Sequence, residues 1–438
     1  MLLVRIWSLL FRIFYKDLEV EGLENVPKDK PILFVSNHTN AILDPFCIMV
    51  ALQRRVMITA RSTLVRFPFF GMIMKSIGVI TFDRSQDKVR NRDRNHNMQS
   101  IQKCSDAIHH KKPVCIFPEG QSHSDPKLRP FKNGAARIAI DYEQRYGQNT
   151  PLFIVPVGLF FKEKSTYRST ALVRFNTFIQ VDNVMKNNPN PRQITQEIEK
   201  GIQQVTLHFN STAESEKLIW LGELLVNYKG SYPLTKDASN LKQLTKLTRK
   251  LQYKYTEFKS NPKVQKLESN VDRLKSAMHK HGIATTDLFV PYSLWRSILF
   301  ALINTVILLV GFPVFIISTM LHIIQYYLTK LIAKRFTKAQ DQWASNMIVI
   351  GSFIFPIFYF LYLAILAIMN PKWVLICAIG LPLFGYLSLL YIDRLTFSFR
   401  RSLAFCKLNL NPRLRAELTD SATHIIKDIN QLKEVLRV

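Results

Sequence analysis

Residues 31–45 read PILFVSNHTNAILDP, and this stretch decides the fold class of the N-terminal half of the chain. It opens with an apolar run, Pro31–Ser36, that is typical of a buried strand, and an apolar helical pattern begins at Leu43. The polar residues Asn37 and His38 stand directly after the strand. A strand that passes through a short polar segment into a helix is typical of α/β proteins.

The same alternation of strand and helix patterns continues from residue 17 to residue 210. Short apolar runs predict strands at Pro31–Ser36, Val56–Ala60, Gly78–Phe82, Val114–Phe117, Phe153–Phe161 and Ala171–Phe175. Periodic patterns predict helices at Leu43–Gln53, Leu64–Ser76, His96–His110, Gly134–Arg145 and Arg192–Phe209. The alternation predicts an α/β layer fold for this part of the chain.

His38 and Asp44 form the first candidate pair for chemistry. A histidine just past a strand can take a proton from a hydroxyl, provided that a carboxylate fixes its tautomer and stabilises the imidazolium. Asp44 is near enough in sequence to be that carboxylate. The pair alone is weak evidence, and without further motifs a helix-capping or structural histidine would be the better interpretation.

Further motifs follow in a fixed order: Phe69–Gly71 with Gly78–Arg84, then Ile116–His123 with Pro130–Gly134, and finally Ile154–Gly158. With the segment around His38, they resemble the glycerophospholipid acyltransferase superfamily over about residues 20–180. This superfamily includes the glycerol-3-phosphate and 1-acylglycerol-3-phosphate acyltransferases. The resemblance implies an acyltransferase layer fold, with a mixed sheet flanked by helices.

Two details of the motifs are most similar to the glycerol-3-phosphate/dihydroxyacetone-phosphate acyltransferases, which carry a similar C-terminal membrane region. His38 and Asp44 enclose five residues, where the superfamily usually has four. The segment Gln121–His123 follows Pro118–Gly120, where the superfamily usually has one residue and then Arg-Ser. For Asp44 to face His38, a turn before Leu43 must absorb the additional residue.

The resemblance implies a role for each matching residue. His38 would be the general base that deprotonates the glycerol hydroxyl as it attacks an acyl thioester, and Asp44 would orient it. Arg84 would bind the phosphate of the acceptor, with a surface ion pair to Asp83 or Asp87 as the alternative. Glu119 would accept hydrogen bonds from the acceptor hydroxyls.

The remaining substrate-binding candidates surround these residues. Gly120 would let the backbone approach the substrate closely, and Asn37 stands beside the general base. Ser122 lies near the position that usually holds a phosphate-contacting arginine, so phosphate binding would shift to Lys132 or Arg129. Val155–Val157 would line the acyl channel. The side chains of His109, His110 and His123 are expected to be exposed. No cofactor or metal is required.

Three stretches without charged residues, Ser297–Thr329, Asn346–Met369 and Trp373–Ile392, predict membrane-embedded helices within residues 291–400. The second and third have 24 and 20 residues, close to the roughly 20 that cross a bilayer, and read as a helical hairpin. The first has 33 residues, with Gly311–Pro313 near its middle. It is too long for one untilted span, so we expect a re-entrant hairpin, or else one kinked, over-long span.

Basic residues flank these stretches and set the expected orientation. Lys275, Lys280 and Arg296 precede them, and clusters at Lys330–Lys338 and Arg394–Arg401 follow the first and third. The positive-inside rule assigns such groups to the cytoplasmic side. We therefore expect an integral membrane protein whose catalytic domain lies on the cytoplasmic face.

The segments outside the catalytic domain are predicted to be helical. Residues 1–16 read as an interfacial amphipathic helix, with a buried core helix as the alternative. Residues 211–290 read as a basic helical connector, which either rests on anionic lipid or is a solvated helical pair. Residues 401–438 read as a cytoplasmic C-terminal helical tail.

The composition limits the kinds of molecule that the protein is expected to bind. The chain of 438 residues has 59 Lys+Arg and 32 Asp+Glu, a net charge of +27. Its five scattered cysteines suit neither a disulfide framework nor a zinc site. No nucleic acid is expected, because zinc-finger spacing, RNP-like strands and basic zippers are missing. The expected partners are an anionic lipid bilayer, phosphorylated substrates and an acidic acyl carrier. The basic segment Lys88–Arg94 either docks such a carrier or is a solvated loop.

The sequence therefore predicts a membrane O-acyltransferase of phospholipid biosynthesis. It would move a fatty acyl group from acyl-CoA or acyl-acyl carrier protein to glycerol 3-phosphate, giving lysophosphatidate. The alternative acceptors are 1-acylglycerol 3-phosphate and dihydroxyacetone phosphate. A non-catalytic membrane-binding protein that retains the fold is the alternative from another class, although such a scaffold has no need of a base at His38.

Overall fold

The computed structural model describes residues 2–62, 71, 78–83, 94–185, 190–228, 230, 233–234, 240–291 and 293–435. The chain forms two compact units. The first comprises Met1–His208 and Leu328–Ile354, and the second comprises Phe209–Tyr327 and Phe355–Val438. The first unit thus contains the predicted catalytic domain together with part of the predicted membrane region.

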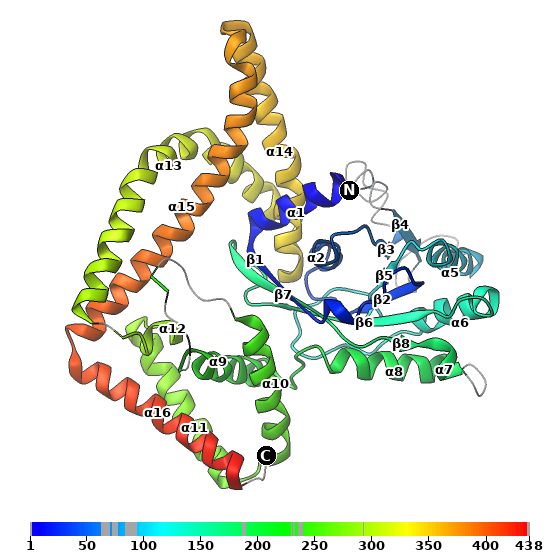
Figure 1. Ribbon diagram of the computed structural model, residues 1–438, viewed down its shortest axis with the longest axis horizontal. Helices are drawn as coiled ribbons and strands as arrows, with labels where there is room; N and C mark the ends of the chain where they lie inside the picture. The colour runs from blue at the N-terminus through cyan, green and yellow to red at the C-terminus, as the bar shows by residue number, and fades with distance from the viewer. Residues whose placement is uncertain are drawn as a thin grey trace. The chain divides into compact units, whose positions relative to one another are not determined.

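An eight-stranded mixed sheet is the centre of the first unit (Figure 1). The strands are β1 Tyr15–Glu21, β2 Ile32–Ser36, β3 Met57–Arg61, β4 Val79–Phe82, β5 Val114–Ile116, β6 Phe153–Phe161, β7 Ser169–Phe175 and β8 Ile179–Gln180. Their order is β1-β7-β6-β2-β5-β3-β4, and β8 pairs with β6. The β6–β7 and β6–β8 pairs are antiparallel, whereas β2 lies parallel to both of its neighbours. The predicted fold class, a mixed sheet flanked by helices, is confirmed.

Helices cover both faces of this sheet. One core cluster joins the sheet to α1 (Leu2–Phe14), α2 (Leu43–Leu52) and the beginning of α14 (Gln340–Met369). The other joins it to α5 (Arg94–His109), α6 (Gly134–Tyr146) and α8 (Pro191–Gln203). Because side chains alternate along a strand, Phe34 of β2 enters the first cluster while Leu33 and Val35 enter the second. Both clusters are apolar, so β2 is buried on both faces, as its apolar sequence predicts.

The pairing of β2 determines where the site forms. β2 and β5 are parallel neighbours, with Val35 opposite Ile116. Their carboxyl ends therefore lie at the same edge of the sheet, and the segments that follow, Asn37–Leu43 and Phe117–Ser122, begin side by side. In open α/β sheets, ligands bind beyond the carboxyl ends of parallel strands.

The N-terminal helix differs from the prediction. Residues 1–16 were expected to form one interfacial helix, but α1 ends at Phe14, and Tyr15 begins the edge strand β1. Phe11 and Phe14 are each 2 % exposed, and the Tyr15 ring lies 5.3 Å from that of Phe161. The aromatic side chains at the end of α1 thus find partners in the core of the protein, so the interfacial interpretation is wrong for this end of the helix.

The second unit contains a helical bundle. Its helices are α9 Thr212–Tyr228, α10 Leu241–Phe258, α11 Pro262–His281, α12 Thr285–Leu288 and α16 Pro412–Val435. Leu221, Val271 and Leu274 share a buried cluster with Leu418 and Ile425. The predicted connector and the predicted C-terminal tail therefore form one common core, instead of a solvated pair and a separate tail.

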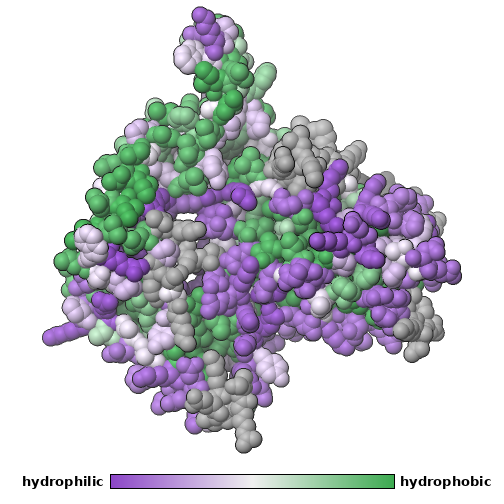
Figure 2. Space-filling model, in the orientation of Figure 1, coloured by the Kyte–Doolittle hydropathy of each residue, from purple (hydrophilic) through white to green (hydrophobic). Residues whose placement is uncertain are grey.

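Long apolar helices complete the chain: α13 Leu294–Phe336, α14 and α15 Val374–Asn409, with the turn Pro371–Trp373 joining the last two as a hairpin. All three are long and apolar enough to cross a membrane. They expose large apolar side chains, among them Val310 and Ile368, and Figure 2 shows apolar residues gathered over these helices. Exposed apolar faces of this extent indicate membrane association.

Helix α13 corrects the expectation of a re-entrant hairpin. It runs through 43 residues without interruption, with Pro313 inside the helix. A proline removes one backbone donor, and apolar spanning helices tolerate that loss. The re-entrant interpretation is wrong. Of the alternative, one kinked, over-long span, the structure shows the single over-long helix.

Candidate active site

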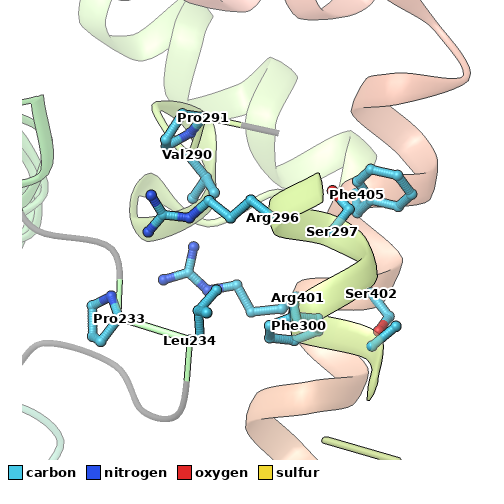
Figure 3. Close-up of a pocket in the computed structure, with 11 residues that line it drawn as sticks. Pro233, Leu234, Val290, Pro291, Arg296, Ser297, Phe300, Arg401, Ser402 and Phe405 are labelled. Atoms are coloured by element: carbon cyan, nitrogen blue, oxygen red, sulfur yellow. The ribbon is translucent and has the colours of Figure 1, made fainter. Parts of the chain in front are cut away.

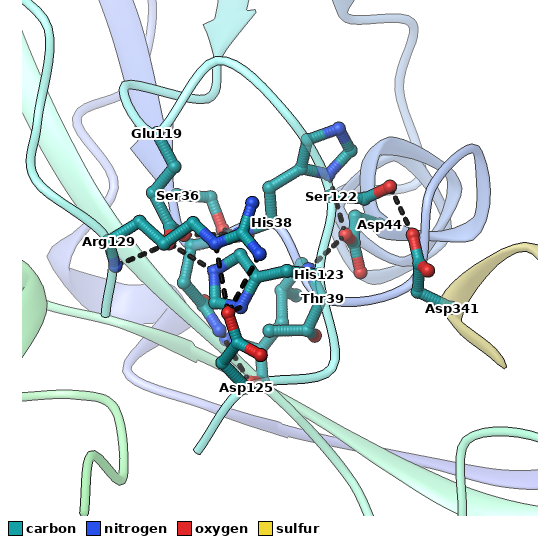
Figure 4. Close-up of polar contacts among 12 residues, drawn as sticks. Ser36, His38, Thr39, Asp44, Glu119, Ser122, His123, Asp125, Arg129 and Asp341 are labelled. Carbon is teal, nitrogen blue, oxygen red and sulfur yellow. Dashed lines mark hydrogen bonds and ion pairs between the residues drawn. The ribbon is translucent and has the colours of Figure 1, made fainter. Parts of the chain in front are cut away.

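His38 and Asp44 meet at the carboxyl end of β2 (Figure 4). The distance from His38 Nδ1 to Asp44 Oδ2 is 2.8 Å. The additional residue between them is absorbed in a turn, in which Leu43 N donates to Asn40 O at 3.0 Å and Ala41 has a left-handed φ of 47°. Asp44 then stands in the first turn of α2 and faces the histidine.

The Asp44 carboxylate fixes both the tautomer and the orientation of His38. Asp44 is fully buried, and its Oδ2 also accepts hydrogen bonds from Thr39 N at 2.7 Å and Asn40 N at 2.8 Å. A carboxylate partner requires a proton on His38 Nδ1, which leaves the lone pair on Nε2. The ring stacks on Phe117 with centroids 4.2 Å apart, and the side chain is 17 % exposed. This arrangement can accept a proton from a substrate hydroxyl.

Glu119 supports the His38 backbone. Its Oε1 accepts a hydrogen bond from His38 N at 2.8 Å, and its Oε2 accepts one from Arg129 N at 2.9 Å. The residue is 3 % exposed. Since both carboxylate oxygens are bonded to protein, the geometry favours a positioning role for Glu119 over the expected contact with acceptor hydroxyls.

His123 was expected to be exposed, and that expectation is wrong. The residue is 4 % exposed, and its Nε2 contacts Glu119 Oε2. Its backbone N donates to His38 O at 3.1 Å. The chain turns back after Gly120 and brings His123 beneath the carboxylate, whereas His109 and His110 are exposed as predicted.

Two predicted substrate-binding residues contact protein groups. The Asn37 amide donates to Leu159 O at 3.1 Å and accepts from Leu159 N at 2.8 Å, which joins the end of β2 to β6. The Ser122 hydroxyl donates to Asp341 Oδ2. These contacts support structural roles. Val155 and Val157, the predicted channel residues, are likewise fully buried in the core.

Gly120 and Lys132 lie together at the Pro–Glu–Gly turn. Gly120 has a φ of 74°, and a Cβ at this position would lie 2.8 Å from Lys132 Nζ. The turn therefore requires glycine, and the exposed Lys132 holds its ammonium group above it. Arg129, the other candidate for phosphate binding, forms an ion pair with Asp125 at 2.8 Å. Arg84 and the segment 88–93 lie outside the described residues.

A contact between α14 and the loop that carries His38, residues 37–42, could not be predicted from the sequence motifs. Ser345 Oγ donates to Asn40 O at 3.0 Å and accepts from Ile42 N at 3.1 Å. Asp341, one turn earlier, accepts from Ser122, and both α14 residues are at least 97 % buried. Asp341 and Ser345 are four residues apart, so they lie on one face of the helix. This spacing is the one feature of the sequence that indicates a polar contact surface on α14.

Lys164 and Tyr15 also belong to the surroundings of the site. Burial lowers the pKa of the Lys164 ammonium, while the nearby carboxylates of Asp44 and Asp341 act in the opposite direction. Tyr15 Oη donates to Lys164 O at 2.8 Å and accepts from Asn40 Nδ2 at 2.6 Å. Lys164 thus brings a cation close to the carboxylates of the site, although its sequence context resembles an ordinary exposed loop.

Ser345→Ala is expected to lower kcat for acyl transfer about tenfold, because two hydrogen bonds to the His38–Asp44 loop, each worth about 1 kcal/mol, are lost. The KM for the acyl donor should change little. Ser352→Ala is the matched control, since the Ser352 hydroxyl donates within α14 to Val349 O. Steady-state kinetics on both variants test this, and equal kcat values for the two would contradict it.

Comparisons with known proteins find two family matches and one similar solved structure for this chain. The family described as "Acyltransferase" matches residues 17–159, and the family "Glycerol-3-phosphate acyltransferase 2 C-terminal domain" matches residues 229–434. A solved structure of the 1-acyl-sn-glycerophosphate acyltransferase PlsC from Thermotoga maritima aligns with a TM-score of 0.34 and 15 % identity, covering 46 % of this chain and 77 % of that one.

Two relatives represent the two acceptor classes. The 1-acyl-sn-glycerol-3-phosphate acyltransferase BAT2 of Brassica napus is 30 % identical over 31 % of this chain and 38 % of its own length. Glycerol-3-phosphate O-acyltransferase 2 of Saccharomyces cerevisiae is 22 % identical over 63 % of this chain and 39 % of its own length. The chain therefore spans about two fifths of the length of these curated relatives. By these matches, residues 17–159 belong to the acyltransferase family, and residues 229–434 belong to the family of glycerol-3-phosphate acyltransferase 2 C-terminal domains.

Proposed function

We propose that this protein acylates glycerol 3-phosphate, with acyl-CoA or acyl-acyl carrier protein as the donor. The observation that carries the proposal is the 2.8 Å contact between His38 Nδ1 and Asp44 Oδ2. His38 Nε2 removes the proton of the glycerol hydroxyl as its oxygen attacks the thioester carbonyl. The carbon–sulfur bond then breaks, and the departing thiolate takes the proton from the imidazolium, so that lysophosphatidate and a free thiol are formed.

Direct transfer is favoured over an acyl-enzyme intermediate. Cys47 and Cys115 are fully buried, and burial raises the pKa of both thiols. A thiol that stays protonated is a poor nucleophile. The hydroxyl of Ser122, which follows the Pro118–Gly120 motif, donates a hydrogen bond to Asp341. These contacts support a mechanism in which the substrate hydroxyl is the attacking group.

Cationic side chains near the turn would bind the phosphate of the acceptor. Lys132 lies above Gly120, and Lys164 lies near the carboxylates of the site. In the sequence motif, Arg84 would add a planar guanidinium, the geometry best suited to phosphate. Asp44 and Glu119 make the site acidic, and these cations would offset that charge.

The membrane helices would keep the site close to its lipid product. Within the described residues, three helices are long and apolar enough to span a bilayer, and the basic residues Lys330, Lys334 and Arg335 stand at the end of α13, in the part that belongs to the first unit. By the positive-inside rule, the catalytic unit would lie on the cytoplasmic face of an anionic bilayer. The match of residues 229–434 to a glycerol-3-phosphate acyltransferase 2 domain supports the choice of acceptor.

A second acceptor, 1-acylglycerol 3-phosphate, is favoured by one observation. Several relatives are 1-acyl-sn-glycerol-3-phosphate acyltransferases, at 28–32 % identity over 29–36 % of this chain. Both acceptors carry a phosphate and a free hydroxyl, so the His38–Asp44 chemistry would serve either one. The two acceptors differ in size: 1-acylglycerol 3-phosphate carries an acyl chain, for which the site would need additional room.

An acceptor competition decides between these proposals. Full-length protein in lipid vesicles receives acyl-CoA with glycerol 3-phosphate, 1-acylglycerol 3-phosphate or dihydroxyacetone phosphate, and a parallel series uses acyl-acyl carrier protein. We expect kcat/KM for glycerol 3-phosphate to exceed the others at least tenfold, a difference of about 1.4 kcal/mol in transition-state binding. A higher value for 1-acylglycerol 3-phosphate would favour the second candidate. Turnover of none of the three would support a non-catalytic membrane protein.

A further inference from the structure

A cavity of about 120 Å³ lies in the second unit, between the beginning of α13 and the C-terminal part of α15 (Figure 3). Arg296 of α13 and Arg401 of α15 both line it, and their guanidinium groups extend from the two helices in the same direction. Val290, Phe300 and Phe405 contribute apolar walls. The cavity is large enough for more than one water molecule.

Arg401 is held in place by protein contacts. It is 7 % exposed, its Nη1 donates to Thr286 O at 3.0 Å, and its Nε lies 3.3 Å from Asp287 Oδ1. Asp287 also forms an ion pair with Arg400 at 2.6 Å, so that one carboxylate is shared by two arginines. The guanidinium of Arg401 is therefore a buried cation whose orientation is set before any ligand binds.

The charge of this cavity favours an anion. Among the described residues that line it, two are arginines and none is acidic. Arg401 keeps its contact with Asp287, and an anion in the cavity would add a charge-assisted contact to each of the two guanidinium groups. Arg296 and Ser297 also stand in the first turn of a 43-residue helix, where the helix dipole adds positive potential.

The two helices that form the cavity expose apolar side chains on their other faces, which indicates the source of the anion. Trp295, Ile298 and Leu302 of α13 are 73 %, 50 % and 61 % exposed, and Phe399 of α15 is 68 % exposed. Tryptophan is enriched at the level of lipid headgroups. The uncharged stretch of α13 begins at Ser297, so the cavity lies where the helix would pass from the headgroup region into hydrocarbon.

From these observations we propose that the cavity binds the phosphate of an anionic glycerophospholipid. Arg296 and Arg401 are the phosphate ligands, and the acyl chains leave the cavity along its apolar walls, Val290, Phe300 and Phe405. The site lies wholly in the second unit, so the proposal requires membrane insertion but does not depend on the acyl-transfer reaction of the first unit.

Lipid binding to the full-length protein tests the proposal. Detergent-solubilised protein is mixed with equal amounts of phosphatidylglycerol and phosphatidylcholine, and bound lipid is measured by native mass spectrometry. Arg296→Gln should weaken phosphatidylglycerol binding about tenfold, since a charge-assisted contact to phosphate is lost, whereas Arg296→Lys should lose about threefold. Arg296 is only partly buried, so both variants should fold, and thermal unfolding verifies this.

Arg413→Gln is the matched control, because Arg413 is an exposed arginine of α16 in the same unit and the change in net charge is identical. Phosphatidylglycerol binding should be unchanged in this variant, and millimolar inorganic phosphate should not displace the lipid from the wild type. Equal loss of lipid in the Arg296→Gln and Arg413→Gln variants would overturn the proposal, as would no loss in either. Complete displacement by inorganic phosphate would assign the cavity to a soluble anion and would equally overturn the lipid site.

Discussion

Replacing His38 by alanine is expected to lower kcat for acyl transfer about 10³-fold, within the range typical for loss of a general base. His38 Nε2 is the atom that takes the substrate proton, and alanine offers no substitute. The fold should survive, because Asp44 Oδ2 still accepts hydrogen bonds from Thr39 N and Asn40 N. Steady-state kinetics with saturating acyl donor and acceptor give the change in kcat, and circular dichroism verifies the fold.

His110→Ala is the control for this prediction. His110 is exposed at the end of α5, in the same unit, and its ring contacts the backbone oxygen of Asp106. We expect kcat for this variant within a factor of two of the wild type. If His38→Ala retained wild-type turnover in folded protein, His38 would not be the base, and the proposed mechanism would be wrong.

The second large effect is expected for Asp44→Asn, which should lower kcat by about 10²- to 10⁴-fold. The asparagine oxygen could replace Oδ2, but without a charge it would not stabilise the imidazolium that forms during the reaction. Its NH₂ group would then occupy the position of Asp44 Oδ1, which is buried and has no hydrogen-bond partner among the described residues. If the amide rotates instead, it donates to His38 Nδ1 and selects the tautomer with no lone pair on Nε2.

The measurements for Asp44→Asn are kcat and the free energy of unfolding. A buried donor without an acceptor costs about 1–3 kcal/mol, so some loss of stability should accompany the loss of activity. Asp29→Asn is the control, since Asp29 is exposed and its left-handed φ of 54° suits asparagine equally well. A kcat for Asp44→Asn within twofold of the control would show that His38 does not need the aspartate.

Much of the sheet could be predicted because its central strands are buried on both faces. β2, β5 and β6 consist of short apolar runs, and their observed bounds differ from the predicted ones by at most one residue at either end. β1 was missed because its residues 17–21, Asp-Leu-Glu-Val-Glu, alternate charged and apolar side chains at the edge of the sheet. The helix predicted at Leu64–Ser76 lies largely outside the described residues.

The meeting of His38 and Asp44 could be predicted because it depends on local sequence. Six positions separate the two residues, and one turn and the start of α2 bring them together. The direction of the Glu119 carboxylate could not be predicted in the same way. It follows from the pairing of β2 with β5, which brings Glu119 to the His38 backbone although the two residues are 81 positions apart in the sequence.

The contact of α14 with the loop that carries His38 joins residues that are still farther apart in the sequence. Ser345 lies 305 positions from Asn40, in a helix that the sequence identified only by its apolar length. The apolar composition of α14 predicts a membrane helix. It does not reveal that the first turns of α14, with Ala344 and Ile348, are buried in the core of the first unit. Hydropathy measures how apolar a segment is, and it cannot distinguish lipid from protein as the apolar neighbour.

The most direct test of the proposed function is product formation by the wild-type protein. Purified full-length protein in lipid vesicles is incubated with acyl-CoA and radiolabelled glycerol 3-phosphate, and the lipid extract is separated by thin-layer chromatography. Labelled lysophosphatidate should form in proportion to the free thiol released, and the His38→Ala protein should give only the background of protein-free vesicles. If wild-type protein formed no labelled lysophosphatidate above that background with either acyl-CoA or acyl-acyl carrier protein, the central claim would be contradicted.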